Sequence, residues 1–201
     1  MSIGMRKFLV IAWCLVPVGV AAYHYGPGQD QMARDGAAAA IREAQAWVGE
    51  EDYASAAEAF ERALATLPDS DRLARYRIRL EKANAQMLAC GLPTAHGDLG
   101  TLLEDVSADP SVPTGLVADV RTALANSQFY MAWLLRLEGH GRETWSPEIE
   151  ASRQNFRLLA EAAEDGGDVE GSRAQRENLE ASIKLARMDL GELQGLPLPS
   201  Q

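Results

Sequence analysis

The pattern of apolar and polar positions from Asp30 onward predicts a chain of helices. Apolar side chains recur three and four residues apart, and the alternating β-branched runs of a half-buried strand do not occur. Glycine and proline interrupt the pattern at short intervals, which indicates short turns between successive helices. Seven helices are expected, at residues 32–48, 53–67, 71–90, 94–106, 116–138, 147–165 and 169–193.

Two local signals refine this pattern. Ser146 followed by Pro147 is a strong helix start, because serine caps a helix and proline fits its first turn. Residues 109–113 contain two prolines and are expected to form a stiff connector, since each proline fixes its own φ and restricts the residue before it.

An uncharged apolar run at residues 8–25 follows Arg6 and Lys7. As a helix this run would span roughly 27 Å, close to the hydrocarbon thickness of a bilayer. Because basic residues stay on the cytoplasmic side, the run is expected to be an uncleaved, single-pass signal anchor that leaves the body extracytoplasmic. A signal peptide cleaved near residues 19–22, giving a secreted or periplasmic product, is one alternative, and a buried core helix is the other.

The chain is therefore divided into a membrane segment with its linker at 1–29, a helical domain at 30–194 and a proline-containing tail at 195–201. All 29 acidic residues lie at Asp30 or later, whereas two of the 19 basic residues precede it. The first 29 residues consequently carry +2 and the rest of the chain carries −12. So acidic a body lacks the basic stripe that a nucleic-acid backbone requires, and no nucleic-acid partner is expected.

Residues 37–70 carry a pattern 34 residues long. Its second half has Tyr53 near the turn, then small alanines and Phe60 at helical spacing, and Pro68 at the end. The segment resembles a tetratricopeptide repeat, and the whole chain is similar to membrane-anchored bacterial repeat proteins. The first half departs from the family at positions that usually hold tryptophan, leucine and glycine: Ala40, Glu43 and Ala44.

The resemblance covers one repeat and implies an all-α stack of antiparallel helix hairpins, closed by a terminal capping helix. An irregular helical bundle that contains one chance match is the alternative. In a stacked array the inner helices line a concave surface that holds a partner segment. These inner helices are expected at residues 37–48, 71–90 and 116–138.

Little in the sequence points to catalysis, a metal or another cofactor. His96 and His140 lie in different segments, and neither a His-x-x-x-His nor a Cys-x-x-Cys spacing occurs. Cys90 ends a predicted helix, where the helix dipole disfavours a thiolate, so it is expected to be a packing residue. Phosphate-binding loops and nucleophile elbows are not found either.

The function that best fits these features is a non-enzymatic scaffold or adaptor, tethered to the membrane, that binds a partner protein outside the cytoplasm. Its contacts are predicted to come from the second and third inner helices: Arg75, Arg79, Gln86, Gln128 and Tyr130. For the two arginines, ion pairing with neighbouring acidic helices is the rival interpretation. Phe129 and Tyr130 are adjacent and cannot face the same way, so one of them is expected to line the groove.

Two other functions stay open. An enzyme or small-ligand binder would place a deep pocket between irregular helices, with carboxylates converging on His96 or His140. A scaffold would instead show an open groove lined by arginine and amide groups. A structural subunit of an envelope complex would use residues 196–201 as a docking peptide.

Overall fold

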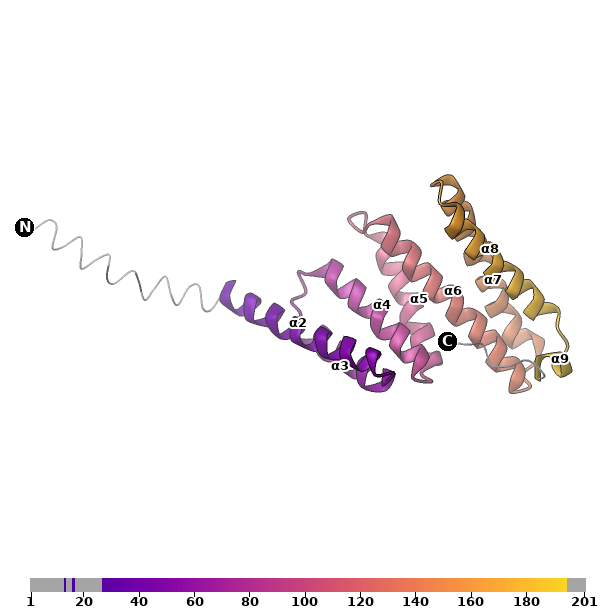
Figure 1. Cartoon of the computed structure of the whole chain (residues 1–201), viewed down its shortest axis with the longest axis horizontal. Coiled ribbons are helices and arrows are strands. Elements are labelled where there is room, and N and C mark those ends of the chain that lie inside the picture. Colours follow the sequence, from indigo (N-terminus) through magenta and orange to yellow (C-terminus); the bar gives the residue numbers. More distant parts are fainter. Residues whose placement is uncertain (1–12, 14–15, 17–26, 195–201) are drawn as a thin grey trace, which may run out of the picture.

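The computed structural model describes Trp13, Val16 and residues 27–194, and all regular secondary structure in this part of the chain is α-helical. The helices follow one another in chain order along the molecule (Figure 1). They are α2 (Pro27–Gly49), α3 (Tyr53–Thr66), α4 (Arg72–Leu88), α5 (Leu92–Ala108), α6 (Thr114–Leu137), α7 (Arg142–Asp165), α8 (Val169–Arg187) and α9 (Leu190–Gln194). The predicted all-α class is confirmed.

The described helices extend from Pro27 to Gln194, so α2 begins three residues before the predicted helical domain at 30–194. The predicted membrane segment at 8–25 lies outside the described residues except for Trp13 and Val16, and the tail at 195–201 lies outside them entirely. Among the residues that the structure describes, no helix combines the length and the apolar character needed to cross a bilayer.

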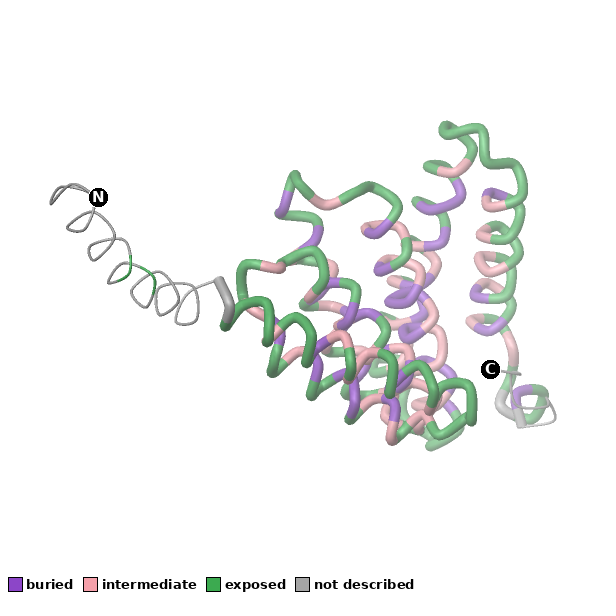
Figure 2. The backbone as a smooth tube through the Cα atoms, turned by 60° about the vertical axis from the view of Figure 1, so that its left-hand side comes forward, coloured by how far each residue is buried: buried purple, intermediate pink, exposed green. Residues whose placement is uncertain are grey.

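Each helix from α2 to α7 packs against the next one in the chain, so short turns fold successive helices into antiparallel hairpins (Figure 1). Alternate helices consequently run in the same direction, and α4 also contacts α6. Buried residues lie along the parts of the helices that meet a neighbour, whereas exposed residues lie at the turns and along the outer faces (Figure 2). The result is a sequential stack of the hairpins α2–α3, α4–α5 and α6–α7, followed by α8.

Small side chains hold the first hairpin together. Asp52 begins α3, because its carboxylate accepts hydrogen bonds from the backbone N of Ser55 at 3.0 Å and from Ser55 Oγ at 2.8 Å. Alanines fill the contact between the two helices and are completely buried, which lets the backbones approach closely: Ala37, Ala44, Ala56, Ala59 and Ala63. Phe60 joins this cluster to Ile78 and Ala85 of α4.

A bidentate ion pair ties α2 to the start of α4. Arg34 Nε and Nη2 donate to the two carboxylate oxygens of Asp71 at 2.7 and 3.0 Å. The hydrogen bond from Arg34 also holds the pKa of the Asp71 carboxyl below its ordinary value, so the pair persists in mild acid. Two residues further along α2, Gly36 passes the end of α3 so closely that a methyl group there would lie 3.2 Å from Thr66 Cγ2.

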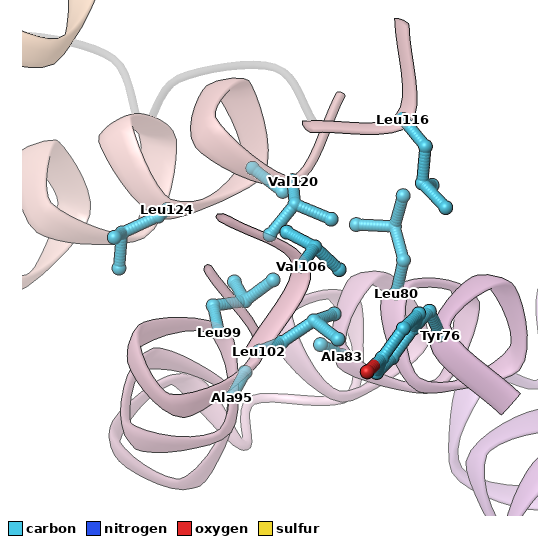
Figure 3. Close-up of a cluster of buried hydrophobic side chains, with 11 residues drawn as sticks. Tyr76, Leu80, Ala83, Ala95, Leu99, Leu102, Val106, Leu116, Val120 and Leu124 are labelled. Carbon is cyan, nitrogen blue, oxygen red and sulfur yellow. The ribbon is translucent and has the colours of Figure 1, made fainter. Parts of the chain in front are cut away.

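A buried cluster joins α4, α5 and α6 (Figure 3). Side chains of α5 point into the space between the other two helices, and Leu99 and Leu102 are 0% and 1% exposed. They meet Tyr76 and Leu80 of α4 on one side and Val120 of α6 on the other. The core of α5 therefore sets the spacing between α4 and α6.

Arg136 of α6 caps the C-terminal end of α8. Its Nη1 donates to the carbonyl oxygen of Leu185 and its Nη2 donates to that of Met188, which satisfies acceptors that a helix end leaves without partners. The guanidinium also lies over the Trp145 ring, 4.6 Å from the centroid. Burial lowers the pKa of Arg136 from its ordinary value. This one side chain joins α6, α7 and α8.

The predicted start of the sixth helix is wrong. α7 begins at Arg142, and Pro147 lies inside it rather than in the first turn. The prediction relied on Ser146 as a cap, but Trp145 packs against Arg136, and this contact favours a helix that starts earlier. Pro147 is tolerated because the carbonyl with which its ring would clash belongs to the first turn, where the helix is free to bend.

The predicted helix at 169–193 is interrupted at Met188 and Asp189. Asp189 Oδ1 accepts a hydrogen bond from the backbone N of Glu192 at 2.7 Å, and Glu192 Oε2 accepts one from the backbone N of Asp189 at 3.2 Å. This reciprocal arrangement is a capping box, which starts α9 as a new helix. The break turns Leu193 back toward α6, where it is 1% exposed in a cluster with Trp133.

Candidate functional site

A groove with a volume of about 850 Å³ lies between α4 and α6, and we call it the α4–α6 groove. Its lining is mainly apolar and comes from the end of α4, the turn into α5 and the second half of α6: Asn84, Met87, Leu88, Cys90, Leu92, Asn126, Tyr130, Trp133, Leu134 and Leu137. A concave apolar surface with a few polar groups is the usual form of a binding site.

Helical spacing brings these side chains to one face. On α6, Asn126, Tyr130, Trp133 and Leu137 follow at steps of four, three and four residues, so they line a single stripe. On α4, Leu88 lies one turn beyond Asn84. Because α4 and α6 run in the same direction, the two amides lie toward one end of the groove and the leucines toward the other.

Two carboxylates continue the same stripes beyond the amide end. Glu81 lies one turn before Asn84 on α4, and Asp119 lies two turns before Asn126 on α6. Partial burial raises the pKa of Glu81, and the negative charge of Asp119 raises it further. Neither carboxylate forms an ion pair with another residue of the described chain. The α4–α6 face is therefore acidic at its start and apolar at its end.

Tyr130 and Trp133 form an aromatic wall of the groove. Of the adjacent pair Phe129 and Tyr130, it is Tyr130 that lines the groove, and the two rings meet edge to face with centroids 5.5 Å apart. Trp133 is 8% exposed, and its indole Nε1 is buried without a hydrogen-bond acceptor among the described residues. A buried donor left in this state costs about 1–3 kcal/mol, which an acceptor brought by a bound segment would offset.

Cys90 lines the groove just after α4, in the left-handed region with φ of 62°. The backbone N of Gly91 donates to the carbonyl of Gln86 at 2.7 Å, which completes a Schellman motif with Cys90 in the left-handed position. Two later helices end in the same way with glycine in that position, namely Gly139 and Gly167. The predicted packing role of Cys90 is wrong, because its side chain is exposed.

Replacing Cys90 by glycine is expected to stabilise the protein by about 0.5–1 kcal/mol, because glycine adopts a positive φ without a steric penalty. The free energy of unfolding, measured by urea denaturation of the full-length chain in detergent, checks this. Ala89→Gly is the matched control, since the neighbouring Ala89 has φ of −84° and gains nothing from glycine. Equal effects of the two substitutions would contradict the expectation.

The structure does not place Arg75 and Arg79 in the α4–α6 groove. They line a smaller cleft, of about 280 Å³, between α3, α4 and α5. Arg75 Nη1 donates to the carbonyl oxygens of Leu64 and Leu67 at 3.0 and 2.9 Å, which caps the end of α3. Arg79 Nη1 donates to Asp105 Oδ2 at 2.6 Å. Both guanidinium groups are thus engaged within the chain, as the rival interpretation expected.

The two predicted glutamines also lie apart from the groove lining. Gln128 is buried between α6 and α7, where its Oε1 accepts a hydrogen bond from Asn155 Nδ2 at 2.9 Å. Gln86 lies on α4 with Oε1 buried and without a partner among the described residues. Of the five predicted contact residues, Tyr130 is the one that lines the α4–α6 groove.

His96 belongs to a polar cluster that joins three helices. Its Nδ1 lies 3.1 Å from Ser127 Oγ of α6, and its Nε2 lies 3.5 Å from Glu148 Oε2 of α7. Ser127 is completely buried and donates its hydroxyl proton to the carbonyl of Leu124 at 2.8 Å. The cluster therefore links α5 to α6 through a hydrogen bond and brings the Glu148 carboxylate of α7 beside the His96 ring.

His140 lies in the turn between α6 and α7, where it is exposed and its Nε2 lies 3.3 Å from Glu138 Oε2. Within the described residues, the histidine, cysteine and carboxylate side chains gather nowhere in a group of three or more that would hold a metal ion.

The groove residues that sequence reasoning missed are mainly apolar and include four leucines: Leu88, Leu92, Leu134 and Leu137. For Leu134 and Leu137 a signal was present in the spacing of three and four residues along α6, but of the apolar residues of that helix only Phe129 or Tyr130 was expected to line a groove. Trp133 shows why, because it both packs in a buried cluster and lines the groove.

No protein-family model matches the chain, and no curated protein and no solved structure matches it.

Proposed function

We propose that this chain is a membrane-tethered helical-repeat scaffold that binds a segment of a partner protein in its α4–α6 groove, outside the cytoplasm. The observation that carries the proposal is the polarised face of α4 and α6, with an acidic start and an open apolar end. Leu137 remains 37% exposed there. Grooves of this kind between parallel helices receive helices or extended segments.

The stack of hairpins supports the repeat part of this proposal. α2 and α3 meet through fully buried alanines, and the alanines and Phe60 that carry part of the tetratricopeptide resemblance belong to that cluster. α8 follows the last hairpin, and we propose that it serves as the capping helix that such an array requires. The tether is proposed from the apolar run at 8–25 and the basic pair before it.

The partner segment is proposed to be amphipathic, with a basic residue at one end and apolar side chains at the other. The basic residue would meet Glu81 and Asp119, which lack an ion-pair partner among the described residues, and the apolar part would cover Leu88, Tyr130 and Leu137. The stripe from Asp119 to Leu137 is about 27 Å long, which corresponds to about five turns of a partner helix.

Leu137→Asp tests this function. A photo-crosslinking residue at position 137 identifies the partner in native membranes, and the affinity of the purified partner for the full-length chain is then measured. The aspartate is expected to weaken binding about tenfold or more, because a charge replaces an apolar contact. Leu158→Asp on α7 is the matched control, since Leu158 is 39% exposed and lies outside the groove, and it is expected to leave binding unchanged.

A second pair of variants tests the charge of the partner. Glu81→Lys with Asp119→Lys is expected to weaken binding and to reverse its dependence on salt, because the attraction to a basic residue is replaced by a repulsion that salt screens. Equal binding by Leu137→Asp and Leu158→Asp would exclude the groove as the binding site. Unchanged binding by the lysine variants would leave the groove in place and exclude a basic partner segment.

A further inference from the structure

We propose that residues 196–199 of this chain, Leu-Pro-Leu-Pro, occupy the apolar end of the α4–α6 groove and thereby compete with the partner. The inference concerns the regulation of the proposed binding site and rests on that function for its biological meaning. Its physical content, a contact between the tail and the groove within one chain, is tested without any partner.

The starting point of the tail favours this contact. α9 ends at Gln194, immediately before the tail. Leu193 of α9 is buried in the cluster that also contains Trp133 and, at its edge, Tyr130. Because both aromatic residues line the groove as well, the tail starts beside the aromatic wall of the groove.

The length of the tail also fits. A Leu-Pro-Leu-Pro sequence favours an extended polyproline II conformation, in which four residues span about 12 Å. Along α6, the distance from Tyr130 to Leu137 is about 10 Å. The four residues therefore match the apolar end of the groove and fall short of Glu81 and Asp119.

The chemistry of the two surfaces is complementary. Polyproline segments dock in grooves lined by aromatic side chains, because they lose little conformational entropy on binding and leave their carbonyl groups free. Trp133, which lines the groove, has a buried Nε1 without an acceptor among the described residues. Residues 195–201 carry no charged side chain, so nothing in their side chains opposes burial against Leu88, Leu134 and Leu137.

Cys90 provides the measurement, because its exposed side chain lines the groove. The full-length chain in detergent, carrying Cys14→Ser so that Cys90 is the one thiol, is treated with a maleimide and the modification rate is followed by mass spectrometry. Leu196→Asp with Leu198→Asp is expected to raise the rate about threefold or more, since a tail bound about two thirds of the time shields the thiol. Ser200→Asp with Gln201→Asp adds the same charges beyond the apolar residues and is expected to leave the rate unchanged.

A synthetic peptide of residues 195–201, added to the Leu196→Asp, Leu198→Asp chain, is expected to restore protection of Cys90. Equal rates in all three chains would overturn the proposal, as would a protection that grows with protein concentration, which would assign the groove to the tail of a second copy. These outcomes are separate from the partner experiment. Loss of the tail contact leaves the effect of Leu137→Asp on partner binding intact, and loss of partner binding leaves the protection of Cys90 intact.

Discussion

Replacing Arg136 by methionine is expected to destabilise the protein by about 3 kcal/mol, because the carbonyl oxygens of Leu185 and Met188 lose charge-assisted hydrogen bonds in a buried place. The stacking over Trp145 is lost at the same time. Methionine fills much of the same volume, so the change reports the polar contacts rather than a cavity. For a chain of this length the loss corresponds to a decrease of roughly 6–12 °C in Tm, measured by circular dichroism of the full-length chain.

Arg142→Met is the matched control for this experiment. Arg142 lies 6.0 Å from the centroid of the same Trp145 ring, but it is exposed and caps no helix. Its replacement is expected to change the free energy of unfolding by less than about 0.5 kcal/mol. A similar decrease in Tm for both variants would show that the cation over Trp145, and not the cap of α8, accounts for the effect.

Leu99→Ala is expected to destabilise the protein by about 3–4 kcal/mol, because the completely buried side chain leaves a cavity between α4, α5 and α6. The substitution is also expected to weaken partner binding, since Met87 both packs on this core and lines the α4–α6 groove. Thermal unfolding measures the first effect, and the affinity of the purified partner measures the second.

The comparison variant is Leu73→Ala on α4. Leu73 is 38% exposed, so the same change in side chain removes little buried surface and is expected to lower Tm by no more than about 2 °C. A Leu99→Ala protein with an unchanged Tm would mean that α5 is not the element that supports α4 and α6.

The sequence predicted the helices well where local signals and packing agree. α3 was expected at 53–67 and occupies Tyr53–Thr66, with Asp52 as its cap and Pro68 beyond its end. At α7 the local signal and the packing disagree. Ser146 and Pro147 form a strong local start, but Trp145 packs against Arg136 of the preceding helix, and α7 begins earlier, at Arg142. A local pattern carries no information about such a contact.

The candidate site was less predictable for a related reason. The spacing of residues predicted an apolar face on α4 and on α6 and a basic face on α4. It did not predict which neighbouring helix each face meets. Arg75 and Arg79 share a helix face that meets α3 and α5. Arg75 donates hydrogen bonds to carbonyl oxygens at the end of α3, and Arg79 donates one to the Asp105 carboxylate of α5. Tyr130 was recoverable because its adjacent neighbour Phe129 forces one ring away from the core.

The length of α2 sets the angle between the first turn of that helix and the α4–α6 groove. Thr66, the last residue of α3, lies beside Gly36, so the nine residues of α2 from Pro27 to Asp35 continue beyond the hairpin as a single helix about 13 Å long. The Arg34–Asp71 pair fixes this helix to the stack. Since an α-helix turns by about 100° per residue, one residue added to or removed from this stretch would rotate the stack by that angle about the helix axis. The number of residues between Pro27 and Gly36 therefore sets the angle, about the axis of α2, between the first turn of that helix and the α4–α6 groove.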